Sequence, residues 1–87
     1  MTIPKSVNIG GHRFKVVYPY KLRSKEAFYG RISYDKKEIH ITKGEPRVAF
    51  WHEILHGIDR VYNSEGLSEP TIRRLAQGLY QVTKEMV

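Results

Sequence analysis

The 87-residue sequence contains no cysteine, so it can form neither a disulfide bond nor a thiolate metal site. It has no apolar run near the roughly 20 residues that a membrane span requires. Its first residues also lack the apolar stretch of a signal peptide. These absences predict one cytoplasmic domain over residues 1–87, without a membrane partner. Any metal in it must be held by histidine and carboxylate side chains.

The formal net charge of +6 is unevenly distributed along the chain. Residues 1–47 hold eleven Lys and Arg against four Asp and Glu, whereas residues 48–87 hold four against five. A basic half can bind nucleic acid or another anionic partner. However, no Lys/Arg run exceeds two residues, and a solvated basic face accounts for the same charge. Nucleic acid is therefore a weakly supported partner.

The first half of the chain has the alternating polar and apolar pattern of β-strands. A first hairpin is predicted around the Gly10-Gly11 turn, between residues 6–9 and 14–18. A second is predicted between residues 29–34 and 38–42, joined by the turn at Asp35-Lys36-Lys37. The segment from Lys21 to Phe28 reads either as a loop or as one helical turn.

The apolar period changes to about 3.6 after Pro46, which predicts two amphipathic helices. The first ends at Asn63-Ser64-Glu65-Gly66, and its apolar stripe comprises Val48, Trp51, Ile54, Leu55, Ile58, Val61 and Tyr62. The second starts near Glu69, capped by Ser68 or Glu69, and its stripe comprises Ile72, Leu75, Ala76, Leu79, Val82 and Met86. Gly78 interrupts this helix and is expected to mark close packing. The predicted fold class is α+β, a small antiparallel sheet of two hairpins followed by two packed helices.

The first helix carries the motif His52-Glu53-Ile54-Leu55-His56, which is H-E-x-x-H. Two histidines four residues apart project from one helical face and can converge on one metal ion. The glutamate after the first histidine can act as general base on a water at that metal. The motif face is distinct from the stripe of Trp51, Leu55 and Ile58, which is expected to form the core.

A catalytic zinc needs a third protein ligand, and no histidine follows His56. Asp59 is better placed for an auxiliary role or a salt bridge, Glu65 lies in a turn, and Glu85 lies near the chain end. Glu69 lies in line with the apolar stripe of the second helix, where a carboxylate is costly unless a cation meets it. The alternative for Glu69 is a carboxylate favoured by the helix dipole. We predict His52, His56 and Glu69 as ligands, with Asp59 or Glu65 as alternatives to Glu69.

Four aromatic or histidine residues outside the motif have simpler interpretations. Tyr80 is an auxiliary candidate that could stabilise an oxyanion, although an interface role suits it better. His40 is expected to be an exposed strand residue, His12 a turn residue, and Trp51 a core anchor.

Three segments of the chain resemble a known group of proteins, the small metallopeptidase-like proteins of phages and prophages related to the ImmA/IrrE zinc peptidases. The resemblance spans roughly residues 29–83, and it rests on Gly30-Arg31-Ile32-Ser33-Tyr34-Asp35 with Glu38-Ile39-His40-Ile41, on Trp51-His52-Glu53-Ile54-Leu55-His56, and on Leu67-Ser68-Glu69 with Leu75-Ala76-Gln77-Gly78-Leu79-Tyr80-Gln81-Val82. It implies a minimal zincin-like fold with a gluzincin-like site. In that site His52, His56 and Glu69 bind Zn²⁺ and Glu53 is the base. It also implies a protein that acts inside a bacterial host.

The leading functional hypothesis is therefore zinc-dependent hydrolysis of a peptide or protein substrate. A substrate strand is expected to add along Glu38–Thr42, and a host or phage partner protein could contribute to recognition. One alternative is a non-catalytic domain in which zinc ties the two helices together. The other is a basic module that binds nucleic acid or an acidic protein.

Overall fold

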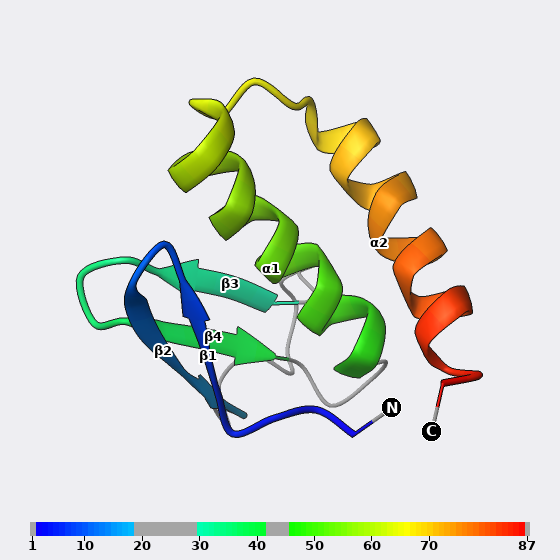
Figure 1. Ribbon diagram of the computed structural model, residues 1–87, viewed down its shortest axis with the longest axis horizontal. Helices are drawn as coiled ribbons and strands as arrows, with labels where there is room; N and C mark the ends of the chain where they lie inside the picture. Colours follow the sequence, from blue (N-terminus) through cyan, green and yellow to red (C-terminus); the bar gives the residue numbers. More distant parts are fainter. Residues whose placement is uncertain (1, 19–29, 42–45, 87) are drawn as a thin grey trace, which may run out of the picture.

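The computed structural model describes residues 2–18, 30–41 and 46–86, and these form four strands and two helices (Figure 1). The α+β class is confirmed, whereas the alternatives for Lys21 to Phe28 lie outside the described residues. The elements are β1 (Ser6–Ile9), β2 (His12–Val17), β3 (Gly30–Ser33), β4 (Glu38–Ile41), α1 (Pro46–Asn63) and α2 (Glu69–Thr83).

The sheet is mixed, with strand order β1-β2-β4-β3, so the prediction of a purely antiparallel sheet is wrong. Both predicted antiparallel pairs are present, β1 with β2 and β3 with β4. They are joined by a parallel pair between β2 and β4, in which Val16 is opposite Ile39. Parallel neighbours need a connection of a dozen or more residues, and here the connection includes β3, which passes to the outer edge.

The expected docking of a substrate along Glu38–Thr42 is excluded for β4 by this strand order. β4 lies between β2 and β3, and both of its edges are occupied by these neighbours. Thr42 lies outside the described residues. Among the described strands, the outer edges of the sheet belong to β1 and β3.

Helix α1 lies between the sheet and α2, so it packs on both sides (Figure 1). The sheet contributes Phe14, Ile39 and Ile41 to the core, because residues two apart on a strand share one face. From α1 the core receives Ala49, Phe50 and Ile54. None of the helices in the described ranges is long and apolar enough to cross a bilayer.

The face of α1 that packs on the sheet differs from the predicted stripe. Phe50, Ile54 and Gly57 are buried, whereas Ile58 is 40% exposed and Tyr62 is 70% exposed. The prediction failed because a helix packed on two sides has two buried faces, and the apolar pattern alone does not say which one faces the sheet. Gly57 and the charged residue Glu53 are also buried on α1, although neither contributes to an apolar pattern.

Between the two helix glycines Gly57 and Gly78, it is Gly57 that lies at a close contact. A Cβ on Gly57 would lie 2.9 Å from Cδ1 of Ile9 and 3.1 Å from Cδ1 of Ile32, whereas a Cβ on Gly78 would meet nothing within 4 Å. The expectation that Gly78 marks close packing is therefore wrong. Gly57 therefore lies where α1 closely approaches the sheet.

This contrast gives a matched pair of substitutions. Gly57→Ala should be less favourable than Gly78→Ala by about 1–2 kcal/mol in the free energy of unfolding, because the added methyl group overpacks the core and offsets the helix propensity of alanine. Gly78→Ala should raise it by up to about 1 kcal/mol, because alanine favours an exposed helix interior. Urea denaturation followed by circular dichroism measures both values. Equal stabilisation by the two substitutions would contradict the close approach at Gly57.

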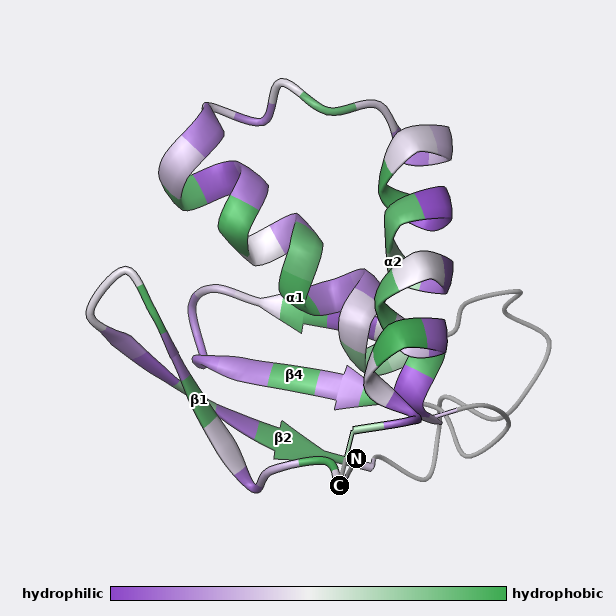
Figure 2. Ribbon diagram, turned by 45° about the vertical axis from the view of Figure 1, so that its right-hand side comes forward, coloured by the Kyte–Doolittle hydropathy of each residue, from purple (hydrophilic) through white to green (hydrophobic). Residues whose placement is uncertain are grey.

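Helix α2 is amphipathic and turns its apolar side towards α1 (Figure 2). Only Ile72 and Ala76 are buried among the described side chains of this helix. The indole Nε1 of Trp51 donates a hydrogen bond to Oγ1 of Thr83 at 3.1 Å, which joins the two helices near the end of α2. Trp51 is half-buried against the core, as expected for an anchor.

Candidate metal centre

The two motif histidines lie side by side in the middle of α1, as their spacing of four residues predicts. Their ring centroids are 4.8 Å apart, and the side chains of His52 and His56 are 15% and 32% exposed. Both project from the part of α1 that meets the start of α2. The pair is therefore open enough for an exogenous ligand to reach it.

Glu69 is brought to the histidines by the start of α2. Ser68 is the N-cap of this helix, and its hydroxyl accepts a hydrogen bond from the Thr71 N–H at 3.3 Å. Glu69 is then the first helical residue. Its Oε1 hydrogen-bonds Nε2 of His52, and its Oε2 lies 2.9 Å from Nε2 of His56.

These three side chains satisfy the donor requirements of a divalent metal. One donor atom from each of His52, His56 and Glu69 lies within 4.8 Å of the other two. Zinc bonds to nitrogen and oxygen of about 2.0–2.2 Å would place tetrahedral donors roughly 3.3 Å apart, so small side-chain shifts suffice. The set of two imidazoles and one carboxylate is also that of a three-ligand catalytic zinc site. The predicted residues thus form one group that could bind a metal ion.

Glu53 lies on the side of the His52 ring opposite to Glu69, and it is not one of the three candidate metal ligands. Its side chain is 4% exposed, and Oε2 lies 3.1 Å from Nδ1 of His52, the ring nitrogen that faces away from Glu69. Nδ1 has no other partner among the described residues, so the two groups form an ion pair when His52 is protonated. Glu53 is thus a buried carboxylate in contact with a ring that Glu69 holds from the other side.

The carboxylates set the protonation of this metal-free group. Glu53 raises the pKa of His52 above its ordinary value of 6.5, burial opposes the rise, and Glu69 adds to it. For Glu69, burial acts to raise the pKa, but the hydrogen bonds and charges of His52 and His56 outweigh it. The pKa of Glu69 is consequently lowered from 4.5. A protonated His52 and an ionised Glu69 therefore stabilise each other.

The direction of these shifts predicts opposite pH dependences with and without metal. The raised pKa of His52 gives stability below 6.5 that is lost as pH rises through the raised value. The lowered pKa of Glu69 gives stability above 4.5 that is lost as pH falls through the lowered value.

After chelation, Tm should therefore be higher at about pH 6 than at about pH 8. With zinc bound the order should reverse, since bound histidines must be deprotonated. Glu69→Gln is the control, and an identical pH dependence in that variant would contradict the assignment.

Asp59, one of the alternatives to Glu69 as a ligand, makes hydrogen bonds in the turn between the helices. It is only 4% exposed. Its Oδ1 accepts hydrogen bonds from Nδ2 of Asn63 at 2.9 Å and from the N–H of Leu67 at 3.2 Å. Glu65, the other alternative, is exposed in the same turn at a positive φ of 57°. Asp59 therefore braces the connection that ends at Ser68, and so it supports the position of Glu69.

Removal of this brace should destabilise the turn between the helices. Asp59→Ala leaves the N–H of Leu67 and the amide of Asn63 without their acceptor, and we expect a loss of about 1–3 kcal/mol in the free energy of unfolding. Asp35→Ala, at an exposed turn position, is the control and should change little. Thermal melts of both variants measure the effect. An Asp59→Ala variant as stable as Asp35→Ala would show that the turn does not depend on this carboxylate.

The structure separates Tyr80 from the metal-binding group. It lies eleven residues after Glu69, which is about 16 Å further along the axis of α2. The ammonium of Lys84 lies 5.6 Å from the centroid of its half-buried ring. This placement favours the interface interpretation of Tyr80 over the oxyanion role.

The other two histidines also lie outside this group. His12 is exposed and begins β2, next to the glycine turn. His40 is only 8% exposed, so the expectation of an exposed strand residue is wrong. It lies on β4, an interior strand of the sheet, and its Nε2 pairs with Oε1 of Glu38 at 2.9 Å. This hydrogen bond lowers the pKa of Glu38.

Tyr34 and Arg60 adjoin the site and were not identified from the sequence. The hydroxyl of Tyr34 donates a long hydrogen bond of 3.5 Å to the backbone carbonyl of His56. The guanidinium of Arg60 lies 4.0 Å from the centroid of the Tyr34 ring. Burial raises the pKa of Tyr34. The only sequence signal was an aromatic residue at the end of a strand, which does not specify a contact with α1.

The comparisons with known proteins identify no relative, so the site is interpreted from its own residues. No family model, curated protein or solved structure matches the chain. The conclusion supported by the site is therefore a chemical one: His52, His56 and Glu69 form a group that could hold a metal ion, with Glu53 buried beside it.

Proposed function

We propose that the protein is a zinc-dependent peptidase whose ion is held by His52, His56 and Glu69. The observation that carries this proposal is the convergence of these three side chains from two helices. Bound there, zinc supplies a Lewis acid that activates a carbonyl group and a water molecule. The resemblance to ImmA/IrrE-type proteins, together with the H-E-x-x-H motif, favours peptide hydrolysis over other zinc-dependent reactions.

Glu53 is the general base in this proposal. It accepts a proton from the water that attacks the carbonyl carbon, and it passes this proton to the amine as the C–N bond breaks. Burial of the carboxylate and its approach of 3.1 Å to His52 keep it next to the site. Its Cγ also lies 3.5 Å from the position that a Cβ on Gly30 would occupy, so the base is adjacent to β3.

The outer edge of β3 is the proposed location of the substrate. No described strand pairs with this edge, and β3 packs against α1. An extended peptide can add to a free strand edge by backbone hydrogen bonds. Because Glu53 adjoins β3 at Gly30, a peptide on this edge would pass close to the base.

Cleavage that depends on metal is the direct test. The chelated protein and the zinc-reconstituted protein are incubated with a library of fluorescence-quenched peptides, and the metal content of both is measured. We expect cleavage only in the reconstituted sample. Absence of cleavage across the library, with zinc bound at one ion per chain, would contradict the peptidase proposal.

A structural metal is the second candidate, and the packing of α2 favours it. Among the described residues of this helix only Ile72 and Ala76 are buried, so α2 has little apolar contact to fix it. An ion shared by His52, His56 and Glu69 would join α2 to α1 and stabilise the folded state. In that case zinc raises Tm and no peptide is cleaved.

A further inference from the structure

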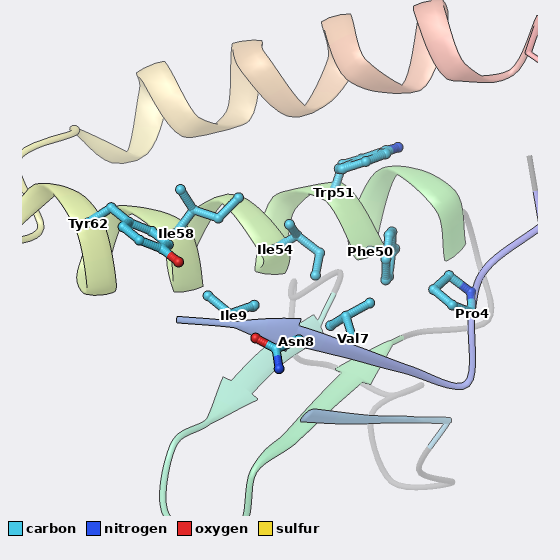
Figure 3. A pocket seen from close by; sticks show the side chains of 9 residues that line it. All are labelled: Pro4, Val7, Asn8, Ile9, Phe50, Trp51, Ile54, Ile58 and Tyr62. Atoms are coloured by element: carbon cyan, nitrogen blue, oxygen red, sulfur yellow. The ribbon is translucent and has the colours of Figure 1, made fainter. Parts of the chain in front are cut away.

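An apolar groove lies between β1 and α1 (Figure 3). Its lining residues include none of the metal-binding group. Ile54 lies two residues from His52, which corresponds to about 200° around the helix. The groove has a volume of about 510 Å³. Val7 and Ile9 point from β1 towards the helix, and Asn8 points the other way. Ile58 on the α1 side is 40% exposed.

The strand that borders this groove lies at an edge of the described sheet. β1 pairs with β2 on one side, and no described strand pairs with it on the other. The N–H of Val16 donates to the carbonyl of Lys5. Since antiparallel strands bond through every second residue, the backbone groups of Ser6 and Asn8 point outwards. A free edge beside an apolar groove can accept an additional strand.

The opposite face of this edge is positively charged. Lys15 pairs with Ser6 and Arg13 pairs with Asn8 on that face. The Arg13 guanidinium extends from β2 to β1, where its Nη1 donates a hydrogen bond to the Ser6 hydroxyl at 3.4 Å. A second, polar cavity of about 720 Å³ on this side is lined by Lys5, Arg13, Lys15, Lys36 and Lys37. Its one lining carboxylate, Glu38, is paired with His40.

We propose that β1 binds an extended segment of a partner protein in which apolar and acidic residues alternate. The segment adds a strand to the outer edge of β1. Its apolar side chains enter the groove between β1 and α1, and its carboxylates meet Arg13 and Lys15 on the other face. Successive side chains of a strand point to opposite faces, so an alternating segment directs its apolar side chains to the groove and its acidic side chains to the basic face.

Two other occupants fit these observations less well. A second copy of the chain paired through β1 would bring Arg13 and Lys15 against the same cations of its neighbour. A nucleic acid would satisfy the cations but would leave the groove of Val7, Ile9 and Ile58 unfilled. An acidic, apolar segment satisfies both surfaces at once.

Three labelled peptides test the proposal by fluorescence anisotropy. The first alternates Val and Glu, the second alternates Val and Lys, and the third holds the Val and Glu residues in two separate blocks. The first peptide should bind with a Kd below about 1 mM. Its binding should weaken at raised salt and persist after chelation, because the site does not involve the metal. The second and third peptides should not bind.

Substitutions on each side of the edge identify the binding surface. Ser6→Pro removes an outward N–H and should weaken binding of the Val-Glu peptide about tenfold or more, compared with Ser6→Ala. Arg13→Glu should weaken it about fivefold, compared with Arg73→Glu on α2. Ile58→Asn should weaken it about fivefold, compared with Val82→Asn, an exposed position on α2. Circular dichroism verifies that each variant is folded, and a misfolded variant leaves the other two as the test.

Four results would overturn the proposal. The first is absence of binding by the Val-Glu peptide, and the second is equal binding of the Val-Lys peptide. The third is a dimer in sedimentation that Ile58→Asn dissociates, which would identify a second copy as the occupant. The fourth is tighter binding of a duplex DNA probe that depends on Arg13 but not on Ile58, which would identify nucleic acid.

Discussion

Glu53→Gln is expected to abolish peptide cleavage while the protein keeps its zinc. Glutamine is nearly isosteric with glutamate but cannot accept the proton from the attacking water, and loss of a general base typically costs about 10²- to 10⁴-fold in rate. The rate of cleavage of a quenched peptide and the zinc content per chain are measured on the same sample. Glu65→Gln, an exposed position in the turn between the helices, is the matched control and should cleave normally.

The same variant separates two roles for this carboxylate. Glu53 lies 3.1 Å from Nδ1 of His52, so it could instead orient the ring for metal binding. Loss of an orienting carboxylate usually weakens metal affinity about 10- to 100-fold. Unchanged affinity with lost cleavage supports a base, whereas weakened affinity with a proportional loss of cleavage indicates orientation. Full cleavage by Glu53→Gln would contradict the proposed mechanism.

Glu69→Ala is expected to remove the metal. The carboxylate contacts both histidines from the start of α2, and two histidines on one helix leave the ion without its third protein ligand. Affinity should therefore fall by more than the roughly 10- to 100-fold typical of residues that only support a ligand. Zinc content should drop from about one per chain to near zero. The rise in Tm that zinc gives the unaltered protein should also disappear.

Glu65→Ala and Asp59→Ala are the comparisons for this experiment. Glu65→Ala should keep its zinc, because Glu65 is exposed in the turn and lies outside the group. Asp59→Ala should bind zinc more weakly than the unaltered protein but more tightly than Glu69→Ala, since Asp59 acts through the turn that precedes α2. Zinc retained by Glu69→Ala and lost from either of the other two variants would reassign the third ligand.

The two edges of the sheet that no described strand covers have different surroundings, and the proposals assign them different roles. β3 lies beside Glu53, and its edge is the proposed location of the substrate. β1 lies at the other end of the strand order, beside an apolar groove and a basic face. A partner bound at β1 would therefore leave the β3 edge accessible. Cleavage that is unchanged in Arg13→Glu would show that the two edges act independently.

The local elements were predictable because their signals are local. The H-E-x-x-H spacing places His52 and His56 on one helical face regardless of the rest of the fold. Ser68 and Pro70 mark the start of α2, and the structure begins this helix at Glu69. The Gly10-Gly11 pair likewise indicated the hairpin of β1 and β2, because glycine tolerates the positive φ of a tight turn. Both glycines have positive φ in the structure.

The arrangement of these elements was not predictable in the same way. Strand order depends on which edges pair after the hairpins form, and no residue in β4 distinguishes an interior strand from an edge strand. For that reason β4 was expected to accept a substrate, whereas His40 was expected to be exposed because it alternates with Ile39 and Ile41; both expectations are wrong. The inner face of α1 was also misassigned, because Gly57 contributes no apolar signal although it permits a close contact with the sheet.

By itself, the sequence determined the α+β class, the two helices and the chemistry of the candidate ligands, since the absence of cysteine left only histidine and carboxylate. Only the tertiary structure decided which of Glu69, Asp59 and Glu65 lies beside the two histidines. All three carboxylates follow His56 in the chain, and their distances from the histidines depend on how the turn after α1 folds back. That turn buries Asp59, leaves Glu65 in solvent and places Glu69 against both imidazoles, because α2 packs against α1.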